Sequence, residues 1–249
     1  MTDAIDFRHP KIRLHVDDEL TDGAAVPLEA GQAHYLLSVM RQGVGDELLV
    51  FNGRAGEWRA RIAALGKKTG TLELVEQTRA QDRLPDIWLC FAPVKRARLD
   101  FIAEKATELG AARIWPVLTA YTQVDRVKTD RMKANAIEAV EQCHGLSVPE
   151  IAEPVKLAAL LKDWPQDRRL IFCDETREAK PMARALADLP RGPAAILTGP
   201  EGGFSPDERA QIRSVASALP VSLGPRILRA DTACLAALSI WQSVQGDWT

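Results

Sequence analysis

The sequence has no long apolar run, few cysteines and no excess of charge of either sign. Of its 249 residues, 4 are cysteines and 46% are hydrophobic, and the net charge is −2. None of its apolar runs reaches the length that a bilayer-spanning helix needs. Residues 1–6 also lack the positive start and the apolar stretch of a signal peptide. We therefore expect a cytoplasmic globular protein without membrane contact, built as one large domain or two unequal ones.

The few cysteines exclude two common uses of this residue. They lie far apart, contain no C-x-x-C pair and sit mostly in apolar surroundings: Cys90, Cys143, Cys173 and Cys234. Disulfides and a zinc site are not expected from such spacing. We predict no metal site.

An excess of positive charge is also lacking. Splitting the chain after Arg83 leaves neither part basic, which weakens the usual signature of a nucleic-acid-binding domain. Local clusters remain at residues 95–98 (KRAR) and 126–133. Such clusters are most often solvated faces, so they support binding of a polyanion only together with other features.

The first third of the chain has the pattern of short strands around one helix. Alternating or short apolar runs predict strands over residues 11–16, 46–51, 58–62 and 72–74. A helix is predicted over residues 30–42, with Gly43 as its stop. Closely spaced short strands favour a small barrel over residues 1–76, and the polar segment 77–86 marks a linker after it.

From residue 87 to residue 249 the pattern changes to strands that alternate with helices. Strands are predicted over residues 87–94, 113–118, 168–173, 194–198 and 221–223. Helices are predicted over residues 96–109, 130–144, 181–189, a stretch after Ser205, and 232–245. The last of these is apolar nearly all round and is expected to be buried. The alternation implies an α/β domain with a mostly parallel sheet.

Residues 197–208 (LTGPEGGFSPDE) read as a strand end, a glycine turn and a helix start. Ser205 is a natural N-cap, and Glu208 completes a capping box. Ligands collect beyond the carboxyl ends of parallel strands, although a purely structural turn is the alternative. The spacing fits neither G-x-G-x-x-G nor the P-loop, and Glu201 would repel a bare phosphate. A neutral or cationic ligand fits better.

A second stretch, residues 223–233 (LGPRILRADTA), repeats this arrangement about 25 residues later in the chain. It combines a strand end, a Gly-Pro turn and a helix start near Asp231. In a parallel sheet both turns open at the same edge, so one pocket can be lined by residues 198–203 and 223–233.

These two stretches carry a resemblance to a known family. Residues 197–203 and 223–229 resemble the paired motifs of the RsmE-type 16S ribosomal RNA uridine-N3 methyltransferases of the SPOUT superfamily. Supporting matches lie at residues 34–41, 44–46, 105–110 (KATELG), 141–143 (EQC) and 148–151 (VPEI). The resemblance covers essentially the whole chain.

The resemblance implies a fold, a cofactor and an assembly. It implies an N-terminal PUA-like β-barrel that binds RNA, and a SPOUT domain over residues 87–249 with a deep C-terminal trefoil knot. The active site would be completed in a homodimer. S-adenosylmethionine would lie bent in the knot, held by Leu197, Thr198, Gly199, Pro200, Glu201, Gly202, Leu223, Gly224, Ile227, Leu228, Thr232 and Ala233.

The implied reaction, methylation of uracil N3, makes demands that match nearby residues. N3 must lose a proton, and negative charge then spreads over the two ring oxygens, where an arginine stabilises it. Arg229 is the first candidate and Arg226 the second. Asp231 either accepts the proton, orients the arginine or only caps the last helix.

The implied substrate is 16S ribosomal RNA, within an assembled small subunit. Its target base must be exposed or flipped, and its backbone must be gripped by cations. The cations that we predict to line this path are Arg13, Arg41, Lys95, Arg96 and Arg98. Each of them also fits an ordinary solvated surface.

The sequence departs from the family pattern at two places. His144-Gly145-Leu146 stands where relatives carry a glycine-arginine pair, and Ala230-Asp231 stands where they carry threonine-glutamate. Three alternatives therefore stay open: a SPOUT enzyme with another RNA target, an RNA-binding relative without catalysis, and a nucleotide-binding α/β enzyme. The last lacks a phosphate motif.

Overall fold

The structure, a computed structural model, describes residues 10, 12–124, 126–176 and 178–248. It divides into two compact units. The small unit holds the described residues up to Arg83 together with Val140–Ser147, and the large unit holds Leu84–Ala139 and the described residues from Val148 onward. The division after Arg83 falls within the predicted linker. The return of Val140–Ser147 to the small unit has no signal in the sequence.

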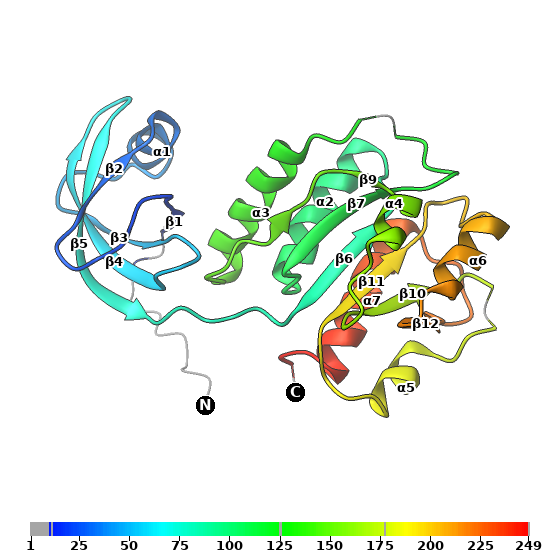
Figure 1. Cartoon of the computed structure of the whole chain (residues 1–249). Coiled ribbons are helices and arrows are strands. Elements are labelled where there is room, and N and C mark those ends of the chain that lie inside the picture. The colour runs from blue at the N-terminus through cyan, green and yellow to red at the C-terminus, as the bar shows by residue number, and fades with distance from the viewer. Residues whose placement is uncertain (1–9, 11, 125, 177, 249) are drawn as a thin grey trace. The chain divides into compact units, whose positions relative to one another are not determined.

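The small unit is built on a five-stranded sheet with the order β1-β3-β4-β5-β2 (Figure 1). Its strands are β1 (Arg13–His15), β2 (Ala25–Leu28), β3 (Glu47–Phe51), β4 (Glu57–Leu65) and β5 (Gly70–Arg79). β1 pairs with β3 in parallel, and the other pairs are antiparallel. The four predicted strands are confirmed. β2, which contains Pro27, was not predicted, although Val26 and Leu28 alternate inward as a strand requires.

The helix predicted over residues 30–42 is shorter and more loosely wound. It consists of α1 (Ala30–His34) followed by a π-helical turn, η1 (Tyr35–Val39). The Met40 N–H donates to the carbonyl of Tyr35, five residues back, at 2.9 Å. Arg41 then takes the left-handed conformation with φ 55°. The helix therefore ends before Arg41, and the predicted stop at Gly43 is wrong.

Arg13 of β1 is buried in the small unit, with 4% of its surface exposed. Its Nε donates to Glu57 Oε2 at 2.8 Å. Its two terminal nitrogens donate to the carbonyls of Val140 and Gly145, each at 2.7 Å. The first of these carbonyls belongs to the last turn of α3 (Thr129–Cys143). Arg13 thus satisfies both a buried carboxylate and carbonyls at a helix C-terminus.

The large unit contains a parallel sheet with the order β12-β10-β11-β6-β7-β8, and β9 pairs with the second half of β7. Its strands are β6 (Ile87–Phe91), β7 (Arg113–Leu118), β8 (Glu150–Ile151), β9 (Val155–Lys156), β10 (Arg169–Cys173), β11 (Ala194–Thr198) and β12 (Ala218–Val221). Its helices, besides α3, are α2 (Arg96–Glu108), α4 (Leu157–Lys162), α5 (Met182–Ala187), α6 (Pro206–Ser214) and α7 (Ala230–Val244). The predicted α/β domain with a parallel sheet is confirmed.

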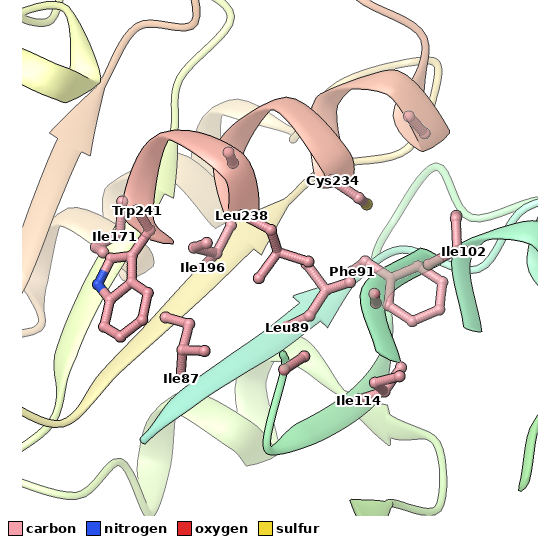
Figure 2. Packing of buried hydrophobic residues seen from close by; sticks show 14 of the residues in the cluster. Ile87, Leu89, Phe91, Ile102, Ile114, Ile171, Ile196, Cys234, Leu238 and Trp241 are labelled. Carbon is pink, nitrogen blue, oxygen red and sulfur yellow. The ribbon is translucent and has the colours of Figure 1, made fainter. Parts of the chain in front are cut away.

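Helices cover both faces of this sheet. α2, α5 and α7 share one core with β6 and β11, whereas α4 and α6 pack on the opposite face. Figure 2 shows Cys234, Leu238 and Trp241 of α7 directed toward the strands that carry Leu89 and Ile196. The buried apolar residues at alternate strand positions therefore serve two different cores, as expected for a sheet covered on both sides.

Some predicted elements differ from the observed ones. The strand predicted over residues 221–223 lies at Ala218–Val221, and α4, β8 and β9 are too short to have given a pattern. The expected burial of the last helix is confirmed, since Cys234, Leu238 and Trp241 of α7 lie in the core, while Leu235 and Ala236 remain partly exposed. Within the described residues, none of the helices combines the length and apolarity that crossing a membrane requires.

The position of Arg13 leads to a stability prediction. Arg13→Met removes the nearest cation from the buried Glu57 carboxylate and leaves it only the Thr78 hydroxyl at 3.0 Å and Arg79 Nη1 at 3.8 Å. We therefore expect the free energy of unfolding to fall by about 3 kcal/mol in urea denaturation. A second substitution, Glu57→Leu, is expected to restore part of this loss. The control is Arg61→Met, whose side chain is 50% exposed and pairs with Glu47 at 3.2 Å; it should cost less than about 1 kcal/mol. Equal losses in the two single variants would contradict a central role for Arg13.

Candidate functional site

A pocket of about 280 Å³ opens at the carboxyl ends of β10, β11 and β12 in the large unit. These three strands are neighbours in the parallel sheet. The pocket is lined by Cys173, Asp174, Glu175, Thr198, Gly199, Pro200, Glu201, Gly202, Gly203, Ser222, Leu223, Gly224, Arg226, Ile227, Leu228, Ala230 and Ala233. The two glycine-containing turns predicted to face each other therefore do so, and the loop after β10 joins them.

The first turn needs glycine for steric reasons. Gly203 has φ +72°, and a Cβ at this position would lie 2.6 Å from Glu175 Oε1. A Cβ at Gly199 would lie 2.8 Å from the ring of Phe204. The turn is closed by a hydrogen bond from Gly203 N–H to the carbonyl of Pro200 at 2.9 Å. Side chains at these glycines would displace the turn from the pocket wall.

Helix α6 fixes the end of this turn. Ser205 is its N-cap, and the predicted capping box with Glu208 is confirmed by hydrogen bonds in both directions, of 3.2 Å and 2.9 Å. The other oxygen of Glu208 accepts from Ala120 N–H at 2.7 Å. One carboxylate therefore holds both the turn and the loop after β7 in place.

The second turn follows β12. Gly224 has φ +112°, and its N–H donates to Ser222 Oγ at 3.2 Å. Beyond it the apolar side chain of Ile227 is 74% exposed although it lines the pocket. An apolar side chain exposed at a pocket mouth is suited to contact a ligand.

The loop after β10 contributes two acidic residues that the sequence analysis missed. Asp174 is buried, and Arg213 Nη2 donates to its Oδ2 at 2.5 Å. Burial on its own would raise the pKa of Asp174, but hydrogen bonds from Thr176 and Arg213 outweigh it and lower that pKa. Glu175 Oε1 accepts from Arg209 Nη1 at 2.7 Å. An acidic pair directly after a parallel strand was a signal available in the sequence, since that edge also carries the two turns.

The predicted cofactor-binding residues gather in this pocket with two exceptions. Leu197 is fully buried in the core beneath the turn, and Thr232 is exposed on α7 outside the lining. The side chain of Thr198 points into the interior, where its Oγ1 lies 3.1 Å from Cys234 Sγ. Burial raises the pKa of the Cys234 thiol to about 12 and also raises that of Cys173. Both cysteines thus remain thiols near neutral pH and are poor nucleophiles.

The predicted catalytic residues are distributed around the pocket mouth. Arg226 lines it, and Arg229 is exposed at the N-cap of α7. Asp231 lies in the first turn of α7, where its Oδ1 accepts from Thr232 N–H at 2.8 Å. Its second oxygen lies 3.7 Å from Nε of Arg98, on α2. Asp231 therefore accepts a hydrogen bond from a backbone amide in the first turn of α7, and Arg98 is the arginine that approaches its carboxylate.

The predicted RNA-contacting cations fall into separate groups. Arg41 and Lys95 are exposed, and Arg98 is half-buried in an ion pair with Glu201. The side chain of Arg96 lies outside the described part of the structure, although its backbone belongs to α2. Arg13 is buried with its donors engaged. The prediction that Arg13 lines an RNA path is therefore wrong, because its guanidinium cannot reach a phosphate.

Metal chemistry has no visible basis in the described residues, which contain no group of three or more His, Cys, Asp or Glu side chains placed to hold an ion. The pocket has instead three carboxylates, from Asp174, Glu175 and Glu201, and one arginine, Arg226. Each carboxylate is paired with an arginine from outside the lining, Asp174 with Arg213, Glu175 with Arg209 and Glu201 with Arg98, so the charge of the pocket is largely balanced.

Comparison with known proteins gives a consistent family match. Residues 81–242 match the RNA methyltransferase domain family, and residues 28–75 match the RNA methyltransferase PUA domain family. The chain is 31% identical over 229 residues to the ribosomal RNA small subunit methyltransferase E of Rickettsia conorii, covering 91% of this chain and 93% of that protein.

Two solved structures share the fold over nearly the whole chain. The ribosomal RNA small subunit methyltransferase E of Neisseria gonorrhoeae, bound to S-adenosylmethionine, is 27% identical with a TM-score of 0.86, covering 96% of this chain and 99% of that one. A methyltransferase from Legionella pneumophila in complex with the cofactor S-adenosylmethionine is 31% identical with a TM-score of 0.84, covering 93% of this chain and 97% of that one.

The lowered pKa of Asp174 predicts a pH-dependent contribution to stability. Its charged form stabilises the fold above the ordinary carboxyl pKa of about 4, and this contribution is lost as the pH falls through the lower pKa of the folded state. Asp174→Asn should lower the free energy of unfolding near pH 7 by about 1–3 kcal/mol. The difference from the wild type should shrink as the solution is acidified below about pH 4. The exposed Asp167→Asn is the control, and a loss for Asp174→Asn that does not change with pH would contradict this assignment.

Proposed function

Because this chain belongs to the ribosomal RNA small subunit methyltransferase E family, we propose that it transfers a methyl group from S-adenosylmethionine to N3 of a specific uridine in 16S ribosomal RNA. The observation that carries the proposal is the pocket formed by the two glycine turns at the carboxyl ends of three adjacent parallel strands. The family matches and the two S-adenosylmethionine-bound structures support it.

The pocket residues fit this cofactor in shape. Gly199 and Gly203 let the first turn pack closely on the Phe204 ring and on Glu175, where a Cβ would collide, and this packing sets the path of the backbone that lines the pocket. The apolar side chains of Leu223, Ile227 and Leu228 line the opposite part of the pocket. The three lining carboxylates are each paired with an arginine, so the fit rests on shape and apolar contact rather than on net charge. When bound, S-adenosylmethionine supplies an electrophilic methyl group.

Methylation of N3 requires the chain to stabilise an anion and to take up a proton. The N3–H bond breaks, the new N–CH₃ bond forms, and the electron pair of the broken S–CH₃ bond stays on sulfur. Negative charge that develops on the uracil oxygens is stabilised by an arginine held close to them. We assign this role to Arg229 with Arg226 as its neighbour at the pocket mouth, and we assign Asp231 to proton uptake or to orientation of the cation.

RNA binding involves both units. We assign the PUA domain to contacts with the RNA backbone, with the exposed Arg41 as one cation. In the large unit Lys95, Arg96 and Arg98 lie at the start of α2, where the N-terminal end of a helix adds positive potential. The substrate in this proposal is the RNA of an assembled small subunit in the cytoplasm.

A homodimer with a trefoil knot at the cofactor pocket completes the proposal. α7 carries apolar residues on most of its surface, yet Leu235 and Ala236 stay partly exposed in the single chain. Phe101 of α2 is 41% exposed and Ile227 is 74% exposed. Exposed apolar side chains of this kind are suited to contact with a second copy of the chain.

The proposed function predicts the loss of one modification in cells. Small-subunit RNA from cells without this protein should lack a single N3-methyluridine that is present in the parent strain, as measured by nuclease digestion and mass spectrometry. Complementation with the wild-type gene should restore it. An unchanged set of N3-methylated uridines would rule the function out.

The same strain tests the assigned residues. Complementation with Arg229→Ala should leave the uridine largely unmethylated, since loss of one charge-stabilising group typically costs about 10²–10³ in rate. Asp231→Asn removes the charge of the side chain but keeps its shape, whereas Asp231→Ala removes both. Full methylation by both Asp231 variants would end its catalytic assignment, and full methylation by Arg229→Ala would end that of Arg229. Arg191→Ala, outside the pocket lining, serves as the control.

A further inference from the structure

A second, smaller pocket shares a wall with the cofactor pocket. Its volume is about 40 Å³, and Pro200, Glu201 and Gly202 of the first turn line both pockets. Its remaining lining comes from α2, the segment before it and the loop after β7: Pro93, Val94, Lys95, Arg98, Tyr121, Gln123 and Val124. None of the roles assigned to the cofactor pocket uses Tyr121 or Gln123.

Tyr121 is an exposed aromatic residue on a well-anchored turn. Its side chain is one of the exposed large hydrophobic groups, with the residue 49% exposed. The turn is closed by a hydrogen bond from Thr122 N–H to the carbonyl of Thr119 at 3.1 Å, and Thr119 N–H donates to Thr122 Oγ1 at 2.9 Å. Ala120 N–H is held by Glu208, the residue of the α6 capping box. The Tyr121 ring is therefore exposed to solvent on a turn that hydrogen bonds hold in place.

The aromatic ring lies next to the cofactor turn. A Cβ at Gly202 would lie 3.3 Å from Tyr121 Cβ, so the backbone of Gly202 and the Tyr121 side chain are direct neighbours. A planar group stacked on Tyr121 would therefore be close to whatever occupies the cofactor pocket. The proximity of two reacting groups is the main requirement of a transfer reaction.

Two cations line this pocket, Lys95 and Arg98, and Arg98 is the one held by carboxylates. It pairs with Glu201 through Nη1, and its Nε lies 3.7 Å from Asp231 Oδ2. A guanidinium has five N–H donors, so these two carboxylates leave other donors free to turn toward a ligand. Arg98 thus stands where the cofactor turn, the start of α7 and the second pocket meet.

We propose that this second pocket is the acceptor subsite, in which the edge of the flipped uracil enters, its ring stacks on Tyr121 and its oxygens face Arg98. The inference rests on the proposed function. The volume agrees with it: a cavity needs about 10–15 Å³ per water-sized group, so 40 Å³ admits the edge of one planar ring rather than a whole nucleotide. Aromatic stacking with charged donors at the ring edge is the usual way in which proteins hold an unstacked base.

The subsite adds Arg98 to the charge-stabilising arginines, beside the Arg229 of the proposed function. Arg98 lines the second pocket, whereas Arg229 is absent from the lining of both pockets. As the proton leaves N3, the Arg98 guanidinium is placed to meet the developing charge, and Asp231 and Glu201 keep that guanidinium oriented.

The test compares variants of the full-length protein on small subunits from the strain that lacks it. Tyr121→Ala should lower kcat/KM for the RNA substrate by about 5- to 150-fold, the range of one lost base-stacking contact. Tyr121→Phe should retain most of the activity because it keeps the ring. Arg98→Met should lower kcat more than it raises KM, with partial recovery in Arg98→Lys. The dissociation constant of S-adenosylmethionine, measured by calorimetry, should stay within about twofold of wild type for the Tyr121 variants.

Two matched controls lie outside both pockets. Trp248→Ala removes another exposed aromatic ring, which is 54% exposed, and Arg184→Ala removes an exposed cation on α5. Both should keep the wild-type kcat/KM.

Each contrary outcome has a distinct meaning. Wild-type kinetics in Tyr121→Ala overturn the acceptor subsite while leaving the proposed function intact. Weaker cofactor binding that accounts for the whole loss in Tyr121→Ala or Arg98→Met also overturns it, because the pocket would then belong to the cofactor. If the wild-type protein methylates no small-subunit RNA, the proposed function fails and the subsite fails with it.

Discussion

The parallel pairing of β12, β10 and β11 is the constraint on which the site depends. Because the three strands run in the same direction and are adjacent, the segments that follow them open at one edge of the sheet. Each segment contributes different groups to the pocket. The first turn contributes accessible backbone, the second turn contributes apolar side chains, and the loop after β10 contributes carboxylates. A change in strand order would separate these groups even if every local motif were kept.

The two cores of the large unit keep this edge in register. α7 packs Cys234, Leu238 and Trp241 against one face of the sheet, while Phe204 and Ile212 pack on the other face. Phe204 follows the first turn directly and contacts Phe172 edge-on, with ring centroids 5.2 Å apart. Two interactions therefore fix the position of the glycine turn: the apolar packing of Phe204 and the capping box between Ser205 and Glu208.

The sequence predicted the parts of the structure that local patterns determine. The α/β alternation, the capping box at Ser205 and both glycine turns follow from residue spacing and are confirmed. Features set by tertiary contacts gave no local signal. Arg13 looked like a surface cation, but Glu57 and the carbonyls of α3 hold it in the interior. The arginine that approaches Asp231 in space is Arg98 of α2, which is distant in the sequence. It is not Arg229, which lies close to Asp231 in the sequence.

The central claim is that the first turn holds S-adenosylmethionine through backbone that only glycine permits, and titration calorimetry of Gly203→Ala tests it most directly. Gly203 has φ +72°, and its added Cβ would lie 2.6 Å from Glu175 Oε1. Gly192→Ala is the matched control, because its Cβ would meet no atom within 4 Å. The account predicts that Gly203→Ala stays folded by circular dichroism and loses affinity by about tenfold or more, while Gly192→Ala binds as wild type. Wild-type affinity in a folded Gly203→Ala protein would contradict it.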